Sequence, residues 1–498
     1  MKLKLIGHQE KYVVEQTLLA LFPEERLAYG TVTAEDARAA VITMTDGGTP
    51  EDPVSRTECR LCWDGEERTE TFSVPLHGTD FEKEGQRRHG LGMCIFRAAQ
   101  AAAHIAPAWG SLTGVRPTKV AAQALAEGRS PQTARSLLED YYRVTPDRAR
   151  MAVECAETGR RAAAELDLRD ISLYIGIPFC PTRCAYCSFV SASVERSFAL
   201  VEPYLQALIR EVRAAGAMTA REGLRVRSFY MGGGTPTTLS ADQMDRLLSA
   251  YEENFDLSDC AESTVEAGRP DTITPEKLAV LRRHGVTRIS VNPQTMEDTV
   301  LRAIGRRHTA EDIRRCLRQV FAAGFRHVNM DLIAGLPEDT PEGFRRSLDE
   351  CLTFGADNIT VHTLSLKKGS TILMEGLSIP PAQAVGEMLD YANPTLRAAG
   401  YAPYYLYRQK YMSGSFENVG WCRPGAENLY NIYIMEELCS ILSMGAGGST
   451  KMVGAPGSRI HRVFNLKYPK EYVERPEKWQ SNQEEFAAFF RQLPRGSR

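Results

Sequence analysis

The feature that most constrains the fold is a repeated pattern between about residues 168 and 370. A short apolar run bounded by turn residues is followed each time by an amphipathic segment long enough for a helix. The apolar runs are SLYIGI (172–177), VRSFYM (226–231), STVEA (263–267), TRISV (287–291), HVNMDLI (327–333) and NITVHTL (358–364). Strands that alternate with helices predict parallel β–α–β units with right-handed crossovers. Six such units predict an α/β fold with a partial (β/α)6 TIM-like barrel, whose chemistry lies at the carboxyl ends of the strands.

The chain is expected to contain more than one domain, because 498 residues exceed the size of an ordinary single domain. Residues 1–165 mix β-like runs with helical stretches and predict an amino-terminal α+β accessory region. Residues 166–370 contain the repeated pattern and predict the barrel core. Residues 371–498 are rich in Tyr and Gly, show less regular patterning, and predict a carboxyl-terminal cap region.

Composition excludes several classes of protein. The hydrophobic fraction of 43% and the charged fraction of 25% are typical of a soluble globular chain. A net charge of -3 argues against nucleic acid as a partner. No apolar run is long enough for a signal peptide or a membrane span, so we expect a cytoplasmic protein. In that compartment the 12 cysteines are expected to be thiols, packing residues or metal ligands rather than a disulfide framework.

The strongest chemical signal is CPTRCAYC, directly after the first predicted strand. Thiolates are soft ligands that suit iron–sulfur clusters. Cys180, Cys184 and Cys187 can bind three irons of a 4Fe–4S cluster and leave the fourth iron open. The amino and carboxylate groups of S-adenosylmethionine (SAM) can chelate an open iron. The alternatives are three buried cysteines spaced by chance, or a zinc site, for which no fourth Cys or His follows at regular spacing.

Further polar residues fall at the ends of the other predicted strands. MGGGTPT (231–237) follows the second strand, and its glycines allow a backbone to approach a ligand closely. The residues at or near the ends of the third to sixth strands are Glu266, Asn292, Gln294, Asp331 and His362. A charged residue inside an apolar strand is costly unless it is paired or ligand-bound. Each has a structural alternative, a tight turn or a salt bridge, but their common position at one rim indicates a site.

Two other motifs are weaker. Cys59 and Cys62 form a single CxxC without a second pair, which packing explains more simply than zinc or redox chemistry. MGAGGSTK (444–451) lacks the order of a phosphate-binding GxxxxGK[ST] loop and predicts a glycine turn.

Four stretches of the chain resemble the oxygen-independent coproporphyrinogen oxidase family of radical SAM proteins. They are SLYIGIPFCPTRCAYCSF, YMGGGTPTTL, SVNPQTMEDTVLRAIGRRHT and NMDLIAGLPEDTPEGF. With an extra amino-terminal region that contains SLTGVRPTK (111–119), the chain looks most like the HemZ-type coproporphyrinogen dehydrogenase branch. The close resemblance covers roughly residues 170 to 370, and a looser one extends over the whole chain.

The resemblance implies roles for residues at matching positions. Cys180, Cys184 and Cys187 would bind the 4Fe–4S cluster. The residues that would contact SAM are Tyr174, Tyr186, Gly233, Gly234, Thr235 and Glu266. Gln294, Arg306 and Asp331 match positions around a second SAM. Reasoning from the strand ends does not find Arg306.

The resemblance also implies an activity. This is the oxygen-independent oxidative decarboxylation of coproporphyrinogen III propionates to vinyl groups in heme biosynthesis, so the implied substrate is a tetrapyrrole. An electron donor would reduce the cluster, and SAM would then release methionine and a 5′-deoxyadenosyl radical. That radical would take hydrogen from the β-carbon of a propionate, and carbon dioxide and one electron would leave.

Two departures distinguish this chain from related branches. The well-studied oxidases carry a further cysteine within Cys-Gly-Cys after the cluster motif, whereas Ser188 and Phe189 follow Cys187 here. Related heme chaperones carry His-Asn-x-x-Tyr-Trp in the carboxyl region, and the nearest stretch here, AENLYNIY (426–433), lacks the His and the Trp. A heme-binding chaperone and a radical SAM enzyme for another tetrapyrrole are therefore the alternatives.

Overall fold

The computed structural model describes residues 1–23, 25–114, 116–187, 192–367, 369–409, 413–454 and 459–493. Val115 of the SLTGVRPTK stretch and the Ser188–Phe189 pair lie outside these residues. The chain divides into two compact units. The amino-terminal unit comprises Met1–Val153 with Arg408–Phe416, and the barrel unit comprises Glu154–Tyr407 with Glu417–Arg498. No helix in the described ranges is long and apolar enough to cross a membrane.

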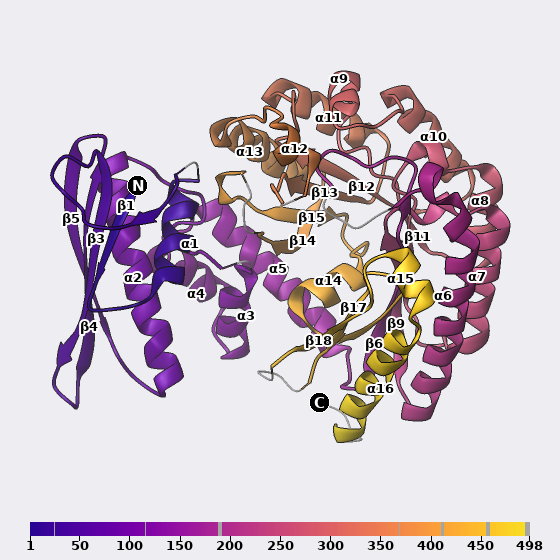
Figure 1. Ribbon diagram of the computed structural model, residues 1–498, viewed down its shortest axis with the longest axis horizontal. Helices are drawn as coiled ribbons and strands as arrows, with labels where there is room; N and C mark the ends of the chain where they lie inside the picture. The colour runs from indigo at the N-terminus through magenta and orange to yellow at the C-terminus, as the bar shows by residue number, and fades with distance from the viewer. Residues whose placement is uncertain are drawn as a thin grey trace. The chain divides into compact units, whose positions relative to one another are not determined.

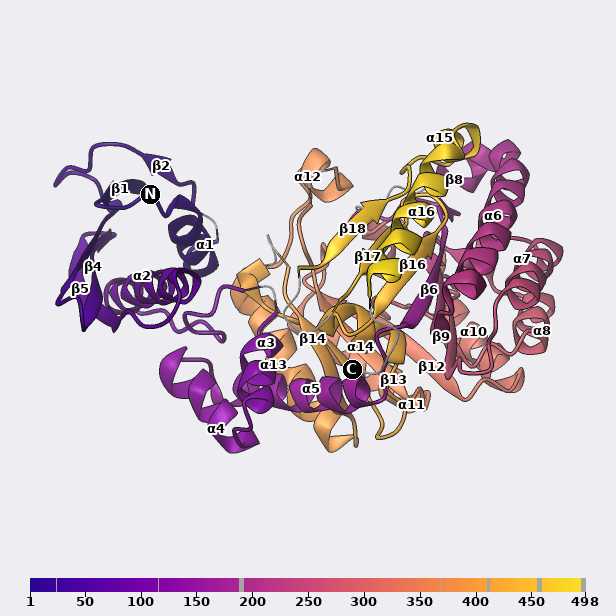
Figure 2. The ribbon, with the colours of Figure 1, turned by 90° about the horizontal axis from the view of Figure 1, so that it is seen from below.

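The amino-terminal unit is built on a five-stranded sheet of order β2-β1-β3-β4-β5. The strands are β1 (Lys2–Ile6), β2 (Ala28–Tyr29), β3 (Arg38–Gly48), β4 (Pro53–Trp63) and β5 (Glu66–Pro75). Two helices, α1 (Lys11–Leu21) and α2 (Asp80–Ala103), lie on one face of this sheet (Figure 2). Their apolar side chains meet those of the sheet in a buried core that includes Leu3, Leu18 and Ile95. The helices that follow are α3 (Thr118–Ala126), α4 (Pro131–Ser136) and α5 (Pro146–Ala164).

The CxxC motif lies on β4 and its two cysteines have different surroundings. Cys59 is completely buried in the core between the sheet and the helices, and burial raises the pKa of its thiol. Cys62 is half-buried, and its Sγ lies 3.6 Å from the carbonyl oxygen of Ala37. Because residues three apart on a strand point to opposite faces, the two thiols do not form one chemical pair.

Six parallel strands form the centre of the barrel unit, as the sequence pattern predicts. They are β6 (Asp170–Ile177), β9 (Arg225–Gly233), β10 (Glu262–Glu266), β11 (Arg288–Ser290), β12 (His327–Ala334) and β13 (Asn358–Thr363). Each strand pairs in parallel with the next one along the chain. Helices α6, α7, α8 and α10 run along the outside of these strands (Figure 1). The predicted partial (β/α)6 barrel is therefore confirmed.

Most of the crossover helices begin at a residue that satisfies their first backbone N–H groups. The crossover helices are α6 (Val194–Glu222), α7 (Ala241–Asn254), α8 (Pro275–Arg283), α9 (Asp298–Ala303), α10 (Ala310–Ala322) and α11 (Pro341–Thr353). The side-chain oxygens that cap α7, α8, α10 and α11 belong to Ser240, Thr274, Thr309 and Thr340. Such a cap contributes about 1 kcal/mol. It also starts each of these helices at a defined residue.

The carboxyl-terminal region extends the same sheet at both edges, where the sequence pattern predicts no strands. Beyond β13 lie β15 (Asn418–Cys422) and β14 (Ala402–Tyr407), both antiparallel to their neighbours. On the other side β16 (Ser440–Met444) pairs in parallel with β6 and leads to β17 (Ser449–Met452) and β18 (His461–Phe464). The remaining helices are α12 (Thr371–Glu375), α13 (Ala382–Ala398), α14 (Leu429–Glu436), α15 (Pro469–Glu474) and α16 (Glu477–Gln492). A separate two-stranded sheet joins β7 (Phe179–Cys180) to β8 (Ala192–Ser193).

Candidate active site at the strand ends

The three motif cysteines lie on one loop at the carboxyl end of β6. Cys184 is buried, whereas Cys180 and Cys187 are half-buried. Within the described ranges, no three His, Cys, Asp or Glu side chains gather as the ligands of one metal ion would. The cysteines of a four-iron cubane bind different irons, so a cluster loop does not need its thiols at one point.

Hydrogen bonds hold this loop, residues 178–187 (the cluster loop), against a neighbouring loop of the barrel. The backbone N–H of Ala185 donates to the carbonyl oxygen of Ile304 at 3.0 Å, and Thr182 Oγ1 donates to that of Gly305 at 3.1 Å. Below the cysteines, the ring of Phe179 is completely buried and lies edge-on to Tyr204, with centroids 5.3 Å apart. The cluster loop is therefore fixed by the fold on both sides of Cys184.

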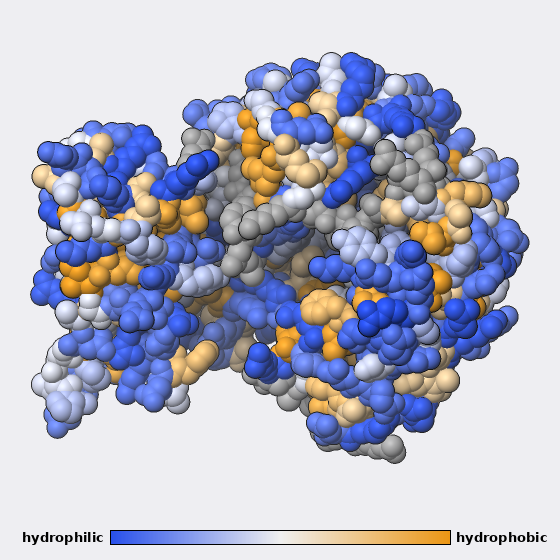
Figure 3. Space-filling model, in the orientation of Figure 1, coloured by the Kyte–Doolittle hydropathy of each residue, from blue (hydrophilic) through white to orange (hydrophobic). Residues whose placement is uncertain are grey.

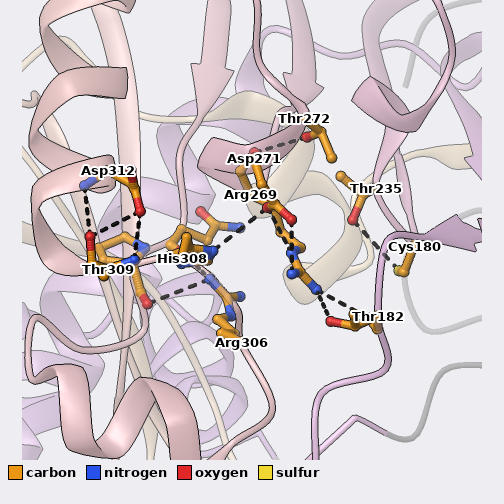
Figure 4. Close-up of polar contacts among 12 residues, drawn as sticks. Cys180, Thr182, Thr235, Arg269, Asp271, Thr272, Arg306, His308, Thr309 and Asp312 are labelled. Atoms are coloured by element: carbon orange, nitrogen blue, oxygen red, sulfur yellow. Dashed lines mark hydrogen bonds and ion pairs between the residues drawn. The ribbon is translucent and has the colours of Figure 1, made fainter.

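The glycine run at the end of β9 packs directly against the cluster loop. The N–H of Gly234 donates to the Ile177 carbonyl oxygen at 2.8 Å, and the N–H of Thr235 donates to that of Phe179 at 2.7 Å. Thr235 Oγ1 lies 3.5 Å from the Sγ of Cys180 (Figure 4). A Cβ at Gly234 would lie only 2.5 Å from the Phe179 carbonyl oxygen. The glycines therefore allow two backbones to meet beside a cysteine, in addition to any contact with a ligand.

The packing of Gly234 predicts a large cost for its replacement. Gly234→Ala is expected to destabilise the barrel unit by about 1–3 kcal/mol, because the added methyl group meets backbone atoms that have no room to move. Chemical denaturation of the apoprotein measures this difference in unfolding free energy. Gly176→Ala on β6 is the matched control, since its Cβ would have neighbours no closer than 3.4 Å. Equal stabilities of the two variants would contradict the packing argument.

Three tyrosines and a glutamate lie together on the inner face of the barrel, where Tyr430 is buried and the other three are half-buried. Tyr174 on β6 and Tyr230 on β9 are paired in register, with ring centroids 6.2 Å apart. Tyr430 of α14 stacks on Tyr230 with a centroid distance of 4.5 Å. The hydroxyl of Tyr230 donates to Glu266 Oε1 at 2.5 Å. Burial raises the pKa of Glu266 to about 7, against the lowering effect of Tyr230. A positively charged ligand beside this carboxyl would favour its ionised form.

Asp331 and Gln294 meet at the end of β12. The N–H of Gln294 donates to the Asp331 carbonyl oxygen at 2.8 Å, and Gln294 has a φ of 69°, which is uncommon for a residue other than glycine. Asn329 Nδ2 donates to Asp331 Oδ1 at 2.8 Å, and His362 Nε2 lies 3.7 Å from Oδ2. Burial acts to raise the pKa of Asp331, but His362 and Asn329 outweigh it and hold the pKa below its usual value. This carboxylate is therefore ionised and faces the barrel interior, where His362 and Asn329 stabilise its charge.

Arg306 contacts the cluster loop. Its Nη2 donates to the hydroxyl of Tyr186 at 3.2 Å and its Nη1 donates to the carbonyl oxygen of Asn292 at 2.5 Å. The side chain is buried, and its charge interacts with the Cys184 sulfur. Its Nε has no hydrogen-bond partner among the described residues. Of the three residues matched to a second SAM, Gln294 and Asp331 thus share a direct contact, and Arg306 joins Tyr186 to the loop that precedes Gln294.

Sequence reasoning missed two cations next to the cluster loop. Arg269, three residues after Glu266, donates from Nη1 to the carbonyl oxygen and to Oγ1 of Thr182, at 3.1 and 2.7 Å. Lys367 follows β13 in a loop whose Gly369 carbonyl oxygen accepts a bond from Arg183 Nη2 at 3.0 Å. Both stand a few residues beyond the strand ends, in loops where charged residues are common, so the strand-end rule does not select them.

Comparison with known proteins establishes the family. A model of the Radical SAM superfamily matches residues 174–351. The oxygen-independent coproporphyrinogen-III oxidase-like protein HemZ of Bacillus subtilis is 37% identical over 468 residues, which cover 92% of each chain. This chain belongs to the oxygen-independent coproporphyrinogen-III oxidase-like family of radical SAM proteins. The family uses a 4Fe–4S cluster and SAM, and these are the cofactors of this chain.

Other relatives share part of the chain. Heme chaperone HemW of Mycobacterium tuberculosis is 30% identical over 312 residues, 61% of this chain and 73% of its own. The solved structure of coproporphyrinogen III oxidase (HemN) from Escherichia coli, a radical SAM enzyme, has 25% identity and a TM-score of 0.53. It covers 65% of this chain and 73% of that one. The likeness to HemN agrees with the partial barrel described above.

The residues present fit both cofactors. Three thiolates on one loop form the soft donor set that iron–sulfur clusters take. A buried carboxyl, a glycine turn without Cβ atoms and the unpartnered Nε of Arg306 lie on the surrounding strand ends and loops. These groups can take up the charged and polar parts of SAM.

Proposed function

We propose that this chain is a radical SAM oxidoreductase that decarboxylates the propionate side chains of coproporphyrinogen III without oxygen. The observation that carries the proposal is the extent of similarity. The relative named as coproporphyrinogen-III oxidase-like matches 92% of this chain, including the amino-terminal unit, whereas the heme chaperone HemW of M. tuberculosis matches 61%. The amino-terminal unit is therefore part of what this chain shares with the oxidase-like relative.

In this proposal the cofactors are held by the residues at the strand ends. Cys180, Cys184 and Cys187 hold the cluster. The residues assigned to SAM are Tyr174, Tyr186, Gly233, Gly234, Thr235 and Glu266, with Gln294, Arg306 and Asp331 around a second molecule. When bound, the reduced cluster and SAM supply a primary carbon radical that removes a hydrogen atom from an unactivated C–H bond. The half-buried rings of Tyr174 and Tyr230, with the cluster loop, limit the access of water to the reacting groups.

The surroundings of the cluster loop suit an apolar ring with carboxylate arms. Lys367 is half-buried beside Cys187, and no carboxylate in the described residues forms an ion pair with it. The N–H of Ile372, at the start of α12, donates to the carbonyl oxygen of Ala185 at 3.2 Å. The next two residues, Leu373 and Met374, are exposed, and apolar side chains gather over the α12–α13 segment in Figure 3. A cation next to an apolar surface is the combination that a propionate-bearing macrocycle requires.

Loss of a β-hydrogen atom, carbon dioxide and one electron from each propionate leaves a vinyl group. Two such events convert coproporphyrinogen III to protoporphyrinogen IX. The hydrogen atom passes to the SAM-derived radical, and an external acceptor takes the electron. The chain's own residues bind the carboxylates, orient the β-carbon and keep the site dry.

A heme-binding chaperone is the second candidate, because several relatives carry that name. The segment of this chain nearest to the chaperone motif, residues 426–433, packs against the barrel strands. Asn428 Nδ2 donates to Thr264 Oγ1 at 3.1 Å, and the N–H of Leu429 donates to Glu262 Oε2 at 3.2 Å. Tyr430 is buried against Tyr230. This arrangement favours the enzyme over a chaperone that would use this segment.

Anaerobic incubation of the reconstituted full chain with SAM, a reductant and coproporphyrinogen III tests the proposal. We expect a product lighter by one or two units of CO2 and H2 in mass spectrometry, with SAM cleavage in proportion. SAM cleavage without any change of the porphyrinogen would refute the substrate assignment and leave the cofactors intact. Stoichiometric heme binding followed by transfer to an acceptor, without decarboxylation, would instead establish the chaperone.

A further inference from the structure

A chain of polar contacts leads from the middle of the cluster loop through Arg269 and Asp271 to His308 (Figure 4). Thr182, between the first two cysteines, accepts two hydrogen bonds from Nη1 of Arg269. Nε and Nη2 of Arg269 each donate to a carboxylate oxygen of Asp271 at 3.1 Å. Asp271 Oδ1 lies 3.6 Å from Nδ1 of His308. On its other side Thr182 contacts Gly305, whose carbonyl oxygen accepts a hydrogen bond from the Thr182 hydroxyl.

Arg269 and Asp271 place their opposite charges at different distances from the cluster loop. The Arg269 side chain is only 3% exposed, so its charge is almost fully removed from water. Burial acts to raise the pKa of Asp271, but His308 and Arg269 outweigh it and hold the pKa well below the usual value, so the carboxylate is ionised. The guanidinium contacts the cluster loop, and the carboxylate lies on its far side. The pair therefore presents its positive end to Thr182, between Cys180 and Cys184.

The buried charge of Arg269 acts strongly on the groups around it. A buried ion interacts with its surroundings through a low effective dielectric constant, so its field at a nearby cluster is weakly screened. Reduction adds one negative charge to a cluster, and a positive charge close by favours the reduced form. Hydrogen bonding and nearby charge are among the known determinants of cluster potentials.

We propose that Arg269 is a positioning residue for the cluster: it fixes Thr182 between Cys180 and Cys184 and turns a buried positive charge toward the cluster. Asp271 holds the guanidinium by a two-pronged contact and offsets part of its charge. The inference rests on the assignment of the three cysteines as ligands. It is independent of which tetrapyrrole the enzyme takes.

Two substitutions with opposite electrostatic effects test this role. Arg269→Gln removes the positive charge and is expected to lower the reduction potential of the reconstituted cluster. Asp271→Asn removes the negative charge, leaves the guanidinium uncompensated, and is expected to raise it. We expect each shift to change the equilibrium constant for reduction about tenfold, which is about 59 mV for a one-electron couple. Electron paramagnetic resonance during an anaerobic redox titration of the full chain, without SAM, measures both shifts.

A merely structural role predicts a different result, because loosening the loop from either side would shift the potential in the same direction. Shifts of the same sign, or no shift, in two folded and iron-replete variants would overturn the proposal. Arg269→Lys keeps the charge and loses the two-pronged contact, so it should retain the potential while releasing iron faster. Arg318→Gln, which removes a charge from an exposed ion pair with Glu311, is the matched control and should change neither quantity. If Arg269→Gln does not fold, the Lys and Asn variants still decide between the two roles.

Discussion

Replacing any one of Cys180, Cys184 or Cys187 with alanine is expected to abolish the cluster. In the proposed site each cysteine supplies a bond to a different iron, and residues 180–187 contain no other Cys or His that could replace it. Loss of a direct ligand should lower bound iron by about tenfold or more, since even changes in the groups around metal ligands cost about 10–100-fold in affinity. Iron analysis and the visible thiolate-to-iron absorbance after anaerobic reconstitution measure this loss.

The control for these variants is Cys260→Ala. Cys260 is a half-buried cysteine of the same unit and is not part of the cluster loop. Its Sγ lies 3.4 Å from the carbonyl oxygen of Glu262. This variant should retain full iron and absorbance. Full iron in any one of the three motif variants would remove that cysteine from the ligand set, and with it the reasoning about an open iron.

SAM binding is expected to weaken as the pH falls below about 7. The pKa of Glu266 is raised to about 7, first by burial and further by Asp331, while Tyr230 and His362 act to lower it. A cationic ligand binds the ionised carboxylate, so below that pKa binding must release a proton. The dissociation constant of SAM should therefore be about tenfold larger at about pH 6 than at about pH 8. Equilibrium binding to the reconstituted chain at the two pH values measures the ratio.

Glu266→Gln separates this effect from other titrations. The variant should bind SAM more weakly at the higher pH and lose most of the pH dependence, because the amide has no proton to release. A pH dependence that persists in Glu266→Gln would assign the titration to another group. The same shift affects folding with a defined sign. A carboxyl whose pKa is higher in the folded state stabilises the fold below its unfolded pKa, and this contribution is lost as the pH rises through about 7.

The strand-end rule proposes part of the candidate site and passes over other parts for an identifiable reason. Glu266 and Asp331 stand inside apolar strands, and their carboxyl groups meet the inner face of the barrel as expected. Arg269 and Lys367 lie in loops after the strands, where charged residues are common and usually solvated. Nothing in their sequence context shows that one is buried against Thr182 and the other lies beside Cys187.

The glycine run has a packing role that the sequence does not reveal. From sequence, the glycines of MGGGTPT let a backbone approach a ligand. In the structure, Gly234 also lets β9 meet the strand that leads into the cysteines, and a Cβ there would overlap the Phe179 carbonyl. The sequence shows that residue 234 has no side chain. Only the structure shows that the Phe179 carbonyl oxygen lies where a Cβ would be.

The sequence by itself predicted the order of the six parallel strands, and it is the source of the proposal that three cysteines bind the cluster at the carboxyl rim of those strands. These features depend on spacing within one loop and on short-range periodicity, which neighbouring residues encode. Only the tertiary structure decided that β14–β18 extend the same sheet, that Tyr430 stacks on Tyr230, and that Arg269 holds the cluster loop. Those contacts join residues far apart in the chain, and their free energy comes from burial and charge pairing that exist only after folding.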